Sequence, residues 1–211
     1  MSPGGERSEP VSVARSGGPG SGPAFYFDLA VPEAYLAAER VLSLMPVACE
    51  WIPVLADDLP GGGWGAWRCA NERDIELSEI ERVAAARGLQ PMRWPGDLPF
   101  DSTLAMRAAT YAKGAGKTVA FSLAAFRQAF AGGRSLAEED NVALAGAACE
   151  IHPRALLQGI RTRSVIAGLE RATALAGERG VRTVPAVWTP DEVFHGDRAI
   201  EAAAAALAVA R

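Results

Sequence analysis

The sequence predicts an α/β protein with a mixed central sheet and an inserted all-helical subdomain. Hydrophobic patterns follow the order strand–helix–strand, then helices only, then strand–strand–helix. A βαβ half and a ββα half separated by helices are typical of a sheet whose strands come from both ends of the chain. The 211 residues, 49% of them hydrophobic, are enough to bury a substantial core. The predicted parts are residues 1–23 as a tail, 24–75 and 181–211 as the two halves, and 76–180 as the helical insertion.

The first 23 residues are rich in Gly, Ser and Pro. Because such a segment buries too little apolar surface to offset its ordering entropy, we expect it to be disordered. It lacks the continuous apolar core of a secretory signal, so we expect a cytoplasmic protein with reduced thiols. Arginines far outnumber the two lysines, Lys113 and Lys117, and Ala and Gly are abundant, which suggests a high-GC bacterial genome.

The first half begins with Ala24–Leu29, an aromatic and apolar run bounded by Gly and Pro that predicts a buried strand. Pro32 suits the first position of a helix, because its missing N–H is one that a helix start leaves unpaired. The loose 3.6-residue period of Glu33–Met45 continues this helix. Val47–Leu55 predicts a second strand, which Pro53 restricts to a sheet edge or to the strand end.

The middle of the chain is predicted to be a loop followed by helices. Paired acids and three glycines indicate a loop over Ala56–Ala70, a helix covers about Glu76–Arg87, and three prolines make Leu89–Phe100 irregular. The later helices run from Asp101 or Ser102 to Lys113, over Val119–Phe130, from a Ser135/Glu138 capping box to Glu150, briefly from Pro153, and over Thr162–Glu178.

After Gly180 the period changes to that of strands. Thr183–Trp188 and Glu192–Phe194 predict two short strands around the turn Thr189-Pro190-Asp191, which indicates a hairpin. Gly196 and Asp197 then lead into a closing Ala-rich helix. The sheet is therefore completed by the C-terminal part of the chain.

Charge and cysteine usage exclude several classes of function. A net charge of −4 gives no sign of nucleic-acid binding, and no apolar run approaches the roughly 20 residues that span a bilayer. Cys49, Cys69 and Cys149 are odd in number and far apart, so the spacing predicts neither a disulfide framework nor a zinc site. We expect each of them to pack as a small apolar residue, and we predict no metal site.

Several segments together resemble the DsbA-like thioredoxin-fold family, particularly the 2-hydroxychromene-2-carboxylate isomerases and kappa-class glutathione transferases. Each segment is short, but their order and spacing cover the chain from Ala24 onward. The segments are Phe25-Tyr26-Phe27-Asp28 with Val31-Pro32-Glu33-Ala34-Tyr35-Leu36, Glu50-Trp51-Ile52-Pro53-Val54-Leu55, Leu98-Pro99-Phe100-Asp101-Ser102 through Arg107, Gly180-Val181-Arg182-Thr183-Val184-Pro185, and Phe194-His195-Gly196-Asp197-Arg198. The resemblance implies a thioredoxin-like fold with a helical insertion.

Three departures from the family pattern bear on chemistry. Val31 stands where the isomerases and kappa transferases have Ser, and Val31 and Ala34 stand where disulfide oxidoreductases have their Cys-x-x-Cys pair. Neither side chain is a nucleophile or a hydrogen-bond donor, so the catalytic group is not identified. Asp101 replaces the family's Asn, which places an anion where anionic glutathione would bind.

The resemblance also implies a set of ligand-binding residues. A cis bond between Val184 and Pro185 would turn the backbone of Val184 toward the first helix, where it pairs with an extended peptide such as glutathione. A plain proline at a strand end is the alternative. Asp101 and Ser102 belong to the loop that helps to hold glutathione. Asp197 and Arg198 either bind the charged ends of glutathione or cap the last helix.

Three further side chains are possible site residues, each with a structural alternative. Glu33 lies in the first helical turn, where it either occupies the anion-favouring helix start or acts as an ordinary stabiliser. His195 is a possible proton donor or an exposed histidine, whereas we expect His152 to be structural. Trp64, with Trp67, either covers a pocket for an aromatic substrate or packs in the core.

These expectations leave three functions open. The first is an isomerase or glutathione transferase relative that binds glutathione or another small thiol, without the usual nucleophile at Val31. The second is a catalytically silent thioredoxin-fold module that binds a small molecule or thiol peptide. The third is a relative of the DsbA-type disulfide oxidoreductases, which the absence of Cys-x-x-Cys disfavours. No nucleic-acid or membrane partner is expected, and a homodimer is possible.

Overall fold

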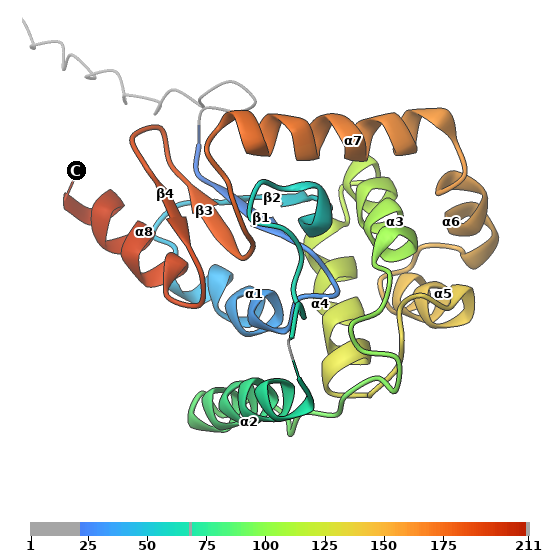
Figure 1. The fold of residues 1–211 in the computed structure, drawn as a ribbon. Helices are drawn as coiled ribbons and strands as arrows, with labels where there is room; N and C mark the ends of the chain where they lie inside the picture. The colour runs from blue at the N-terminus through green and yellow to red at the C-terminus, as the bar shows by residue number, and fades with distance from the viewer. Residues whose placement is uncertain (1–21, 68, 210–211) are drawn as a thin grey trace, which may run out of the picture.

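The structure, a computed structural model, describes residues 22–67 and 69–209. The predicted tail, residues 1–23, lies outside these residues except for its last two, so it stays a prediction. Within the described residues, four strands form one mixed sheet and eight α-helices surround it (Figure 1). This is the predicted thioredoxin-like architecture with its helical insertion.

The sheet has the strand order β2-β1-β3-β4. β1 (Ala24–Phe27) pairs in parallel with β2 (Glu50–Pro53) and antiparallel with β3 (Ala186–Trp188). β3 in turn pairs antiparallel with β4 (Val193–His195), which confirms the predicted hairpin. β2 is an edge strand that ends at Pro53, where the missing N–H of proline breaks no ladder bond.

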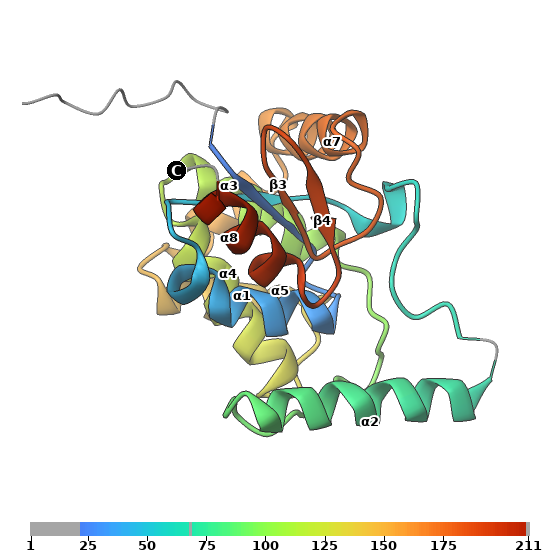
Figure 2. The same cartoon turned by 90° about the vertical axis from the view of Figure 1, so that its left-hand side faces the viewer.

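Alternate residues of β1 enter two different cores, as the two-residue period of a strand requires. Phe25 and Phe27 pack on one face with Trp51 and the helices α1 (Pro32–Leu44), α4 (Thr118–Phe130) and α8 (Ala199–Val209). Ala24 and Tyr26 face a smaller cluster that contains residues of α7 (Arg163–Glu178). The sheet is thus covered by α7 on one side and by α1 and α8 on the other (Figures 1 and 2).

The remaining helices stand beside the sheet. They are α2 (Ala70–Ala86), α3 (Thr103–Gly114), α5 (Glu139–Ala148) and α6 (Pro153–Gly159), and a short 3₁₀ helix covers Ala56–Asp58. α4 packs on α1, α3 and α5, so the helical block shares the core of the sheet. Figure 2 shows α2 along the edge of the molecule, beneath α1.

Several predicted boundaries differ from the structure. α2 begins at Ala70 and not near Glu76, because Ala70, Glu72 and Arg73 favour helix although the side chain of Ile75 is exposed to solvent. β2 and β3 are shorter than predicted, and β3 starts only after Pro185. The proposed Ser135/Glu138 capping box is wrong, since the Ser135 hydroxyl donates to Asp97 and α5 starts at Glu139.

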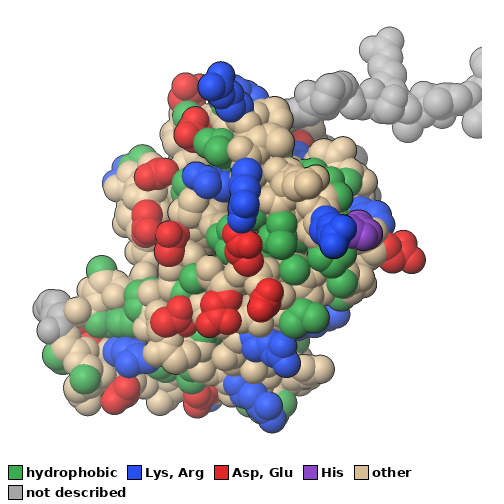
Figure 3. All heavy atoms as spheres, turned by 90° about the vertical axis from the view of Figure 1, so that its right-hand side faces the viewer, with side chains coloured by type: hydrophobic (Ala, Val, Ile, Leu, Met, Phe, Trp, Pro, Cys, Tyr) green, Lys and Arg blue, Asp and Glu red, His purple; other side chains and the backbone are tan. Residues whose placement is uncertain are grey.

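None of the helices in the described part of the chain combines the length and the apolar character that a bilayer crossing requires. On the face drawn in Figure 3, acidic and basic side chains are interspersed among apolar ones.

Candidate functional site

The start of α1 borders a small polar cavity. The turn after β1 places Val31 as the residue before the helix, and Pro32 occupies the first helical position as predicted. The cavity has a volume of about 220 Å³ and brings together four residues that the sequence singled out, Val31, Trp64, Asp101 and Ser102. These residues come from the start of α1, from the loop before α2 and from the loop before α3.

Val31 and Ala34 leave no reactive side chain at this helix start. Val31 is 3% exposed and Ala34 is completely buried, and both pack in the main core. The cysteines sit elsewhere, since Cys49 precedes β2, Cys69 precedes α2 and Cys149 follows α5. Burial raises the pKa of the Cys49 thiol to about 12. The apolar packing expected of the cysteines holds for Cys149, which is buried, but not for the exposed Cys69.

Asp28 is the central polar residue of the cavity, and sequence reasoning gave it no role. It follows β1 directly, so its carboxylate reaches the loops at the ends of β1 and β2. One oxygen accepts the N–H of Ala30 at 2.9 Å, and the other accepts the N–H of Ala56 and the hydroxyl of Ser102, each at 2.9 Å. A charged residue directly after a wholly apolar strand was the signal that could have revealed it.

Burial dominates the electrostatics of Asp28, which is only 2% exposed. Desolvation raises the pKa of its carboxyl group to about 6, against the opposing effect of the hydrogen bonds from Ala30, Ala56 and Ser102. The nearby charge of Asp57 adds to the rise. A carboxyl group with such a pKa exchanges protons near neutral pH, as acid–base catalysis requires.

Asp101 and Ser102 make different hydrogen bonds at the start of α3. The carboxylate of Asp101 accepts the N–H of Thr103 at 2.8 Å, whereas the Ser102 hydroxyl turns to Asp28. Hydrogen bonds from Thr103, helped by Arg107, hold the pKa of Asp101 below its usual value. Asp101 is therefore the side chain that caps the helix, and it keeps a negative charge at the cavity.

Trp64 joins the cavity to α2. Its indole N–H donates to Glu76 at 2.9 Å, and Trp67, packed edge-on against Trp64 with ring centroids 4.8 Å apart, donates to the other oxygen of Glu76. Trp64 therefore lines a polar cavity and anchors the loop, and its ring packs against the main core as the structural alternative predicted. A role in binding an aromatic substrate stays a prediction.

Glu33 lies on the α2 side of the helix start. Burial and the carboxylates of Glu76 and Asp197 raise the pKa of Glu33 to about 7, although its own backbone N–H and Trp64 act in the opposite sense. Within the described residues, its buried Oε2 has no hydrogen-bond partner. Glu33 is thus more than a first-turn stabiliser, because its surroundings oppose its charge.

The C-terminal candidates lie outside the residues that line this cavity. The Val184–Pro185 bond is cis. Outside the helices and strands of residues 22–67 and 69–209, no backbone hydrogen bond involves the main chain of Val184, while the carbonyl of Pro185 accepts the N–H of Gly196 at 2.8 Å. Asp197 accepts two hydrogen bonds from Arg87 at the end of α2, and Arg198 is exposed.

His195 is held by the loop before β3. Its Nε2 accepts the N–H of Arg182 at 3.0 Å, and burial lowers the pKa of its imidazole. The ring therefore remains neutral at neutral pH, and its Nε2 is occupied. These contacts favour a role in holding the loop that precedes Val184.

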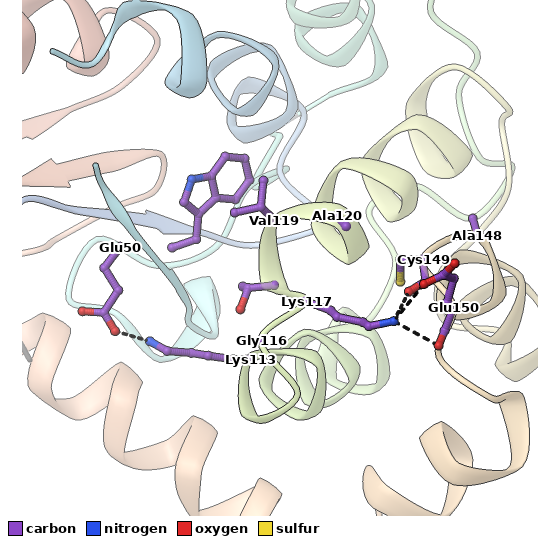
Figure 4. Close-up of a pocket in the computed structure, with 11 residues that line it drawn as sticks. Glu50, Lys113, Gly116, Lys117, Val119, Ala120, Ala148, Cys149 and Glu150 are labelled. Atoms are coloured by element: carbon purple, nitrogen blue, oxygen red, sulfur yellow. Dashed lines mark hydrogen bonds and ion pairs between the residues drawn. The ribbon is translucent and has the colours of Figure 1, made fainter. Parts of the chain in front are cut away.

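A second, wider cavity of about 680 Å³ lies between β2, the turn before α4 and the end of α5 (Figure 4). The chain's two lysines point in opposite directions there. Lys113 binds Glu50 at 2.7 Å, and Lys117 donates to the carbonyl groups of Cys149 and Glu150 at 2.9 and 3.1 Å. None of the site residues named from the sequence lines this cavity. No group of three or more His, Cys, Asp or Glu side chains in the described ranges is arranged to hold a metal ion.

Comparison with known proteins decides the family. The family model described as a DSBA-like thioredoxin domain matches residues 24–208. The chain belongs to the DsbA-like thioredoxin-domain family. The resemblance inferred from the sequence is thereby confirmed, and the match covers both halves of the DsbA-like domain together with the helical insertion.

Solved structures show the same fold at low sequence identity. The DsbA-like domain is similar to a 2-hydroxychromene-2-carboxylate isomerase, with a TM-score of 0.78, 22% identity and coverage of 90% of this chain and 96% of that one. A probable DsbA oxidoreductase from Streptomyces coelicolor is similar with a TM-score of 0.72 and 20% identity, and the match covers 89% of this chain and 88% of that one. The cytosolic disulfide reductase DsbM from Pseudomonas aeruginosa, solved with GSH, is similar with a TM-score of 0.58 and 14% identity. This match covers 81% of this chain and 87% of that one. No curated protein matches the sequence.

Proposed function

We propose that this DsbA-like protein binds glutathione or another small thiol in the cavity beside α1 and acts as an isomerase through that thiol. The observation that carries the proposal is the hydrogen bond from Ser102 to the buried carboxylate of Asp28, both of which line the cavity next to Val31. This pair supplies polar chemistry at a helix start that has lost its own Ser or Cys. The similarity in fold to the isomerase and to DsbM agrees with this class of ligand.

The proposed chemistry is a proton relay. The single proton of the Ser102 hydroxyl goes to Asp28, so a lone pair of the Ser102 oxygen is left to accept the S–H of a bound thiol. As the thiol proton passes to Ser102, the Ser102 proton passes to Asp28, whose pKa of about 6 lies within reach of this transfer. The thiolate that forms lies at the start of α1, where the helix dipole favours negative charge.

Glutathione titration by calorimetry tests this proposal, with S-methylglutathione as the matched ligand that has no thiol proton. We expect glutathione to bind at millimolar concentration or below and to bind more tightly than its methyl derivative. Ser102→Ala should abolish this preference, while Ser164→Ala, on the exposed start of α7, should leave it unchanged. An intact protein that binds neither ligand would contradict the proposal.

The change Val31→Ser distinguishes an isomerase from a binding module without catalytic activity. A hydroxyl group at the start of α1 adds the donor that the helix start lacks, so we expect isomerisation of 2-hydroxychromene-2-carboxylate with glutathione to increase about tenfold or more. The rate is followed by absorbance, with Val31→Ala as the control of similar size. No gain in Val31→Ser would favour a different function.

That second candidate is a catalytically silent binding module. The complete burial of Ala34 and the burial of Val31 favour it, because both side chains serve the core. In this case thiol binding is retained, and neither the parent chain nor Val31→Ser catalyses isomerisation. Appreciable turnover in insulin reduction would instead revive a disulfide exchange function.

A further inference from the structure

A second site candidate lies between α1 and α2, away from the residues of the proposed thiol cavity. This space has a volume of about 460 Å³, within the range of small-molecule sites. Ile75 and Val83 of α2 provide the accessible apolar surface. Leu36 of α1 and Ile80 of α2 also line the cavity but are almost completely buried in the main core, so they support this surface from below.

The walls of this α1–α2 cavity carry carboxylates whose charges are unevenly compensated. Asp197 is paired with Arg87, and Glu79 is paired with Arg82. Glu76 receives two indole N–H groups, which satisfy its oxygens but do not cancel its charge. Hydrogen bonds from its own backbone N–H and from Trp64 act on the partly buried carboxyl group of Glu33, but its buried Oε2 has no hydrogen-bond partner within the described residues.

Bringing the charged forms of Glu33 and Glu76 together beside an apolar surface is unfavourable unless Glu33 takes up a proton or another positive charge enters. A buried carboxylate loses its hydration, and a second carboxylate nearby adds repulsion. A cation at this position would relieve the repulsion. An apolar surface beside a carboxylate oxygen that has no hydrogen-bond partner is complementary to a molecule with an apolar body and one positive end.

We propose that the α1–α2 cavity binds a protonated organic amine, with its ammonium group at Glu33 and its apolar body on Ile75 and Val83. The contact with Glu33 supplies the missing hydrogen-bond donor and the counter-charge. The ligand class is opposite in charge to the thiol peptide of the first cavity. The two sites are therefore independent proposals, and either one can fail alone.

Three probes with one aromatic body test the charge requirement. Benzylamine, benzyl alcohol and benzoate are titrated by calorimetry against the full chain at neutral pH. We expect benzylamine to bind about tenfold more tightly than benzyl alcohol, and benzoate more weakly than either. Equal affinities for amine and alcohol, or no binding of benzylamine to the folded protein, would overturn the proposal.

Two variants then place the ligand. Glu33→Gln keeps the size of the side chain and removes its charge, so it should lower benzylamine affinity about tenfold and leave benzyl alcohol unchanged. Val83→Ala should weaken both probes by a similar factor, because it removes part of the apolar surface. Glu139→Gln, on α5, is the control and should change neither. An unchanged benzylamine affinity in Glu33→Gln overturns the assignment, whatever the wild-type ranking.

Discussion

At the scale of single residues, Asp28 shows what sequence analysis can and cannot reach. Pro32, Val31 and Ala34 were placed correctly from local pattern and resemblance, because their positions depend on neighbours in the chain. The role of Asp28 depends on Ala56 and Ser102, which are far away in sequence. The parallel pairing of β1 and β2 brings Ala56 to Asp28, and the packing of α3 beside β2 brings Ser102. The same holds for Glu33, whose pKa is raised mainly by burial and further by the charges of Glu76 and Asp197.

Stability should fall as the pH rises from about 4 to about 7. Folding raises the pKa of Asp28 from 3.8 to about 6 and that of Glu33 from 4.5 to about 7, so both carboxyl groups bind protons more tightly in the folded state. Their stabilising contribution is therefore complete below their unfolded pKa values and is lost as the pH passes their folded values. The expected loss from the fully buried Asp28 is about 3 kcal/mol, measured by urea unfolding across this range.

Asp28→Asn is the variant that isolates this effect. It should be destabilised by about 1–3 kcal/mol, because its amide NH₂ faces N–H and O–H donors where the carboxylate accepted them. Its unfolding free energy should also lose the dependence on pH between about 4 and 6. A variant that keeps the slope of the parent protein would show that Asp28 does not titrate in this range.

At the scale of elements, the pattern of the chain predicted every strand and α-helix that the structure describes, but it missed the 3₁₀ helix of Ala56–Asp58, and the ends of many elements were displaced. α4 and α7 start within a residue of their predicted positions, because a clear period and a capping Thr162 define them. The start of α2 lies six residues before the predicted one, because its exposed Ile75 and its acidic face give a weak hydrophobic period. Strand ends were set by tertiary pairing, which local propensity does not encode.

The packing of α6 and α7 on α3 yields a matched pair of substitutions. A methyl group on Gly159 of α6 would lie 2.2 Å from the ring of Tyr111, whereas one on Gly168 of α7 would meet Thr110 at an ordinary 3.5 Å. Gly159→Ala should therefore lower the unfolding free energy by about 1–3 kcal/mol. Gly168→Ala should raise it by up to about 1 kcal/mol, because alanine favours the helix. Equal effects in thermal unfolding would contradict this picture of the contact.

At the scale of the whole molecule, the helical insertion and the sheet share one core. The Phe126 ring of α4 lies 5.9 Å from Phe27 of β1 and 6.1 Å from Tyr35 of α1, measured between ring centroids. The sequence predicted the two parts and their order. It could not show that the two parts share one hydrophobic core, because that depends on which face each helix packs against the sheet.

Unfolding should accordingly be a single cooperative transition. Phe126→Ala should lower the unfolding free energy by about 3–5 kcal/mol, and Leu175→Ala, whose side chain is largely exposed, by less than about 1 kcal/mol. Circular dichroism follows the helices, and tryptophan fluorescence includes Trp51 and Trp188 of the sheet. Two separated transitions would show that the insertion folds on its own.

A hydrogen bond between Trp64 and Glu76 links the two proposed sites, so the affinities of their ligands should be coupled. Trp64 borders the thiol cavity, while Glu76, which holds its indole, borders the α1–α2 cavity. A ligand that moved Glu76 would therefore weaken the hydrogen bond that holds Trp64, and a ligand that moved Trp64 would act on Glu76 in the same way. By linkage, the factor by which the first ligand changes the affinity of the second equals the factor by which the second ligand changes the affinity of the first.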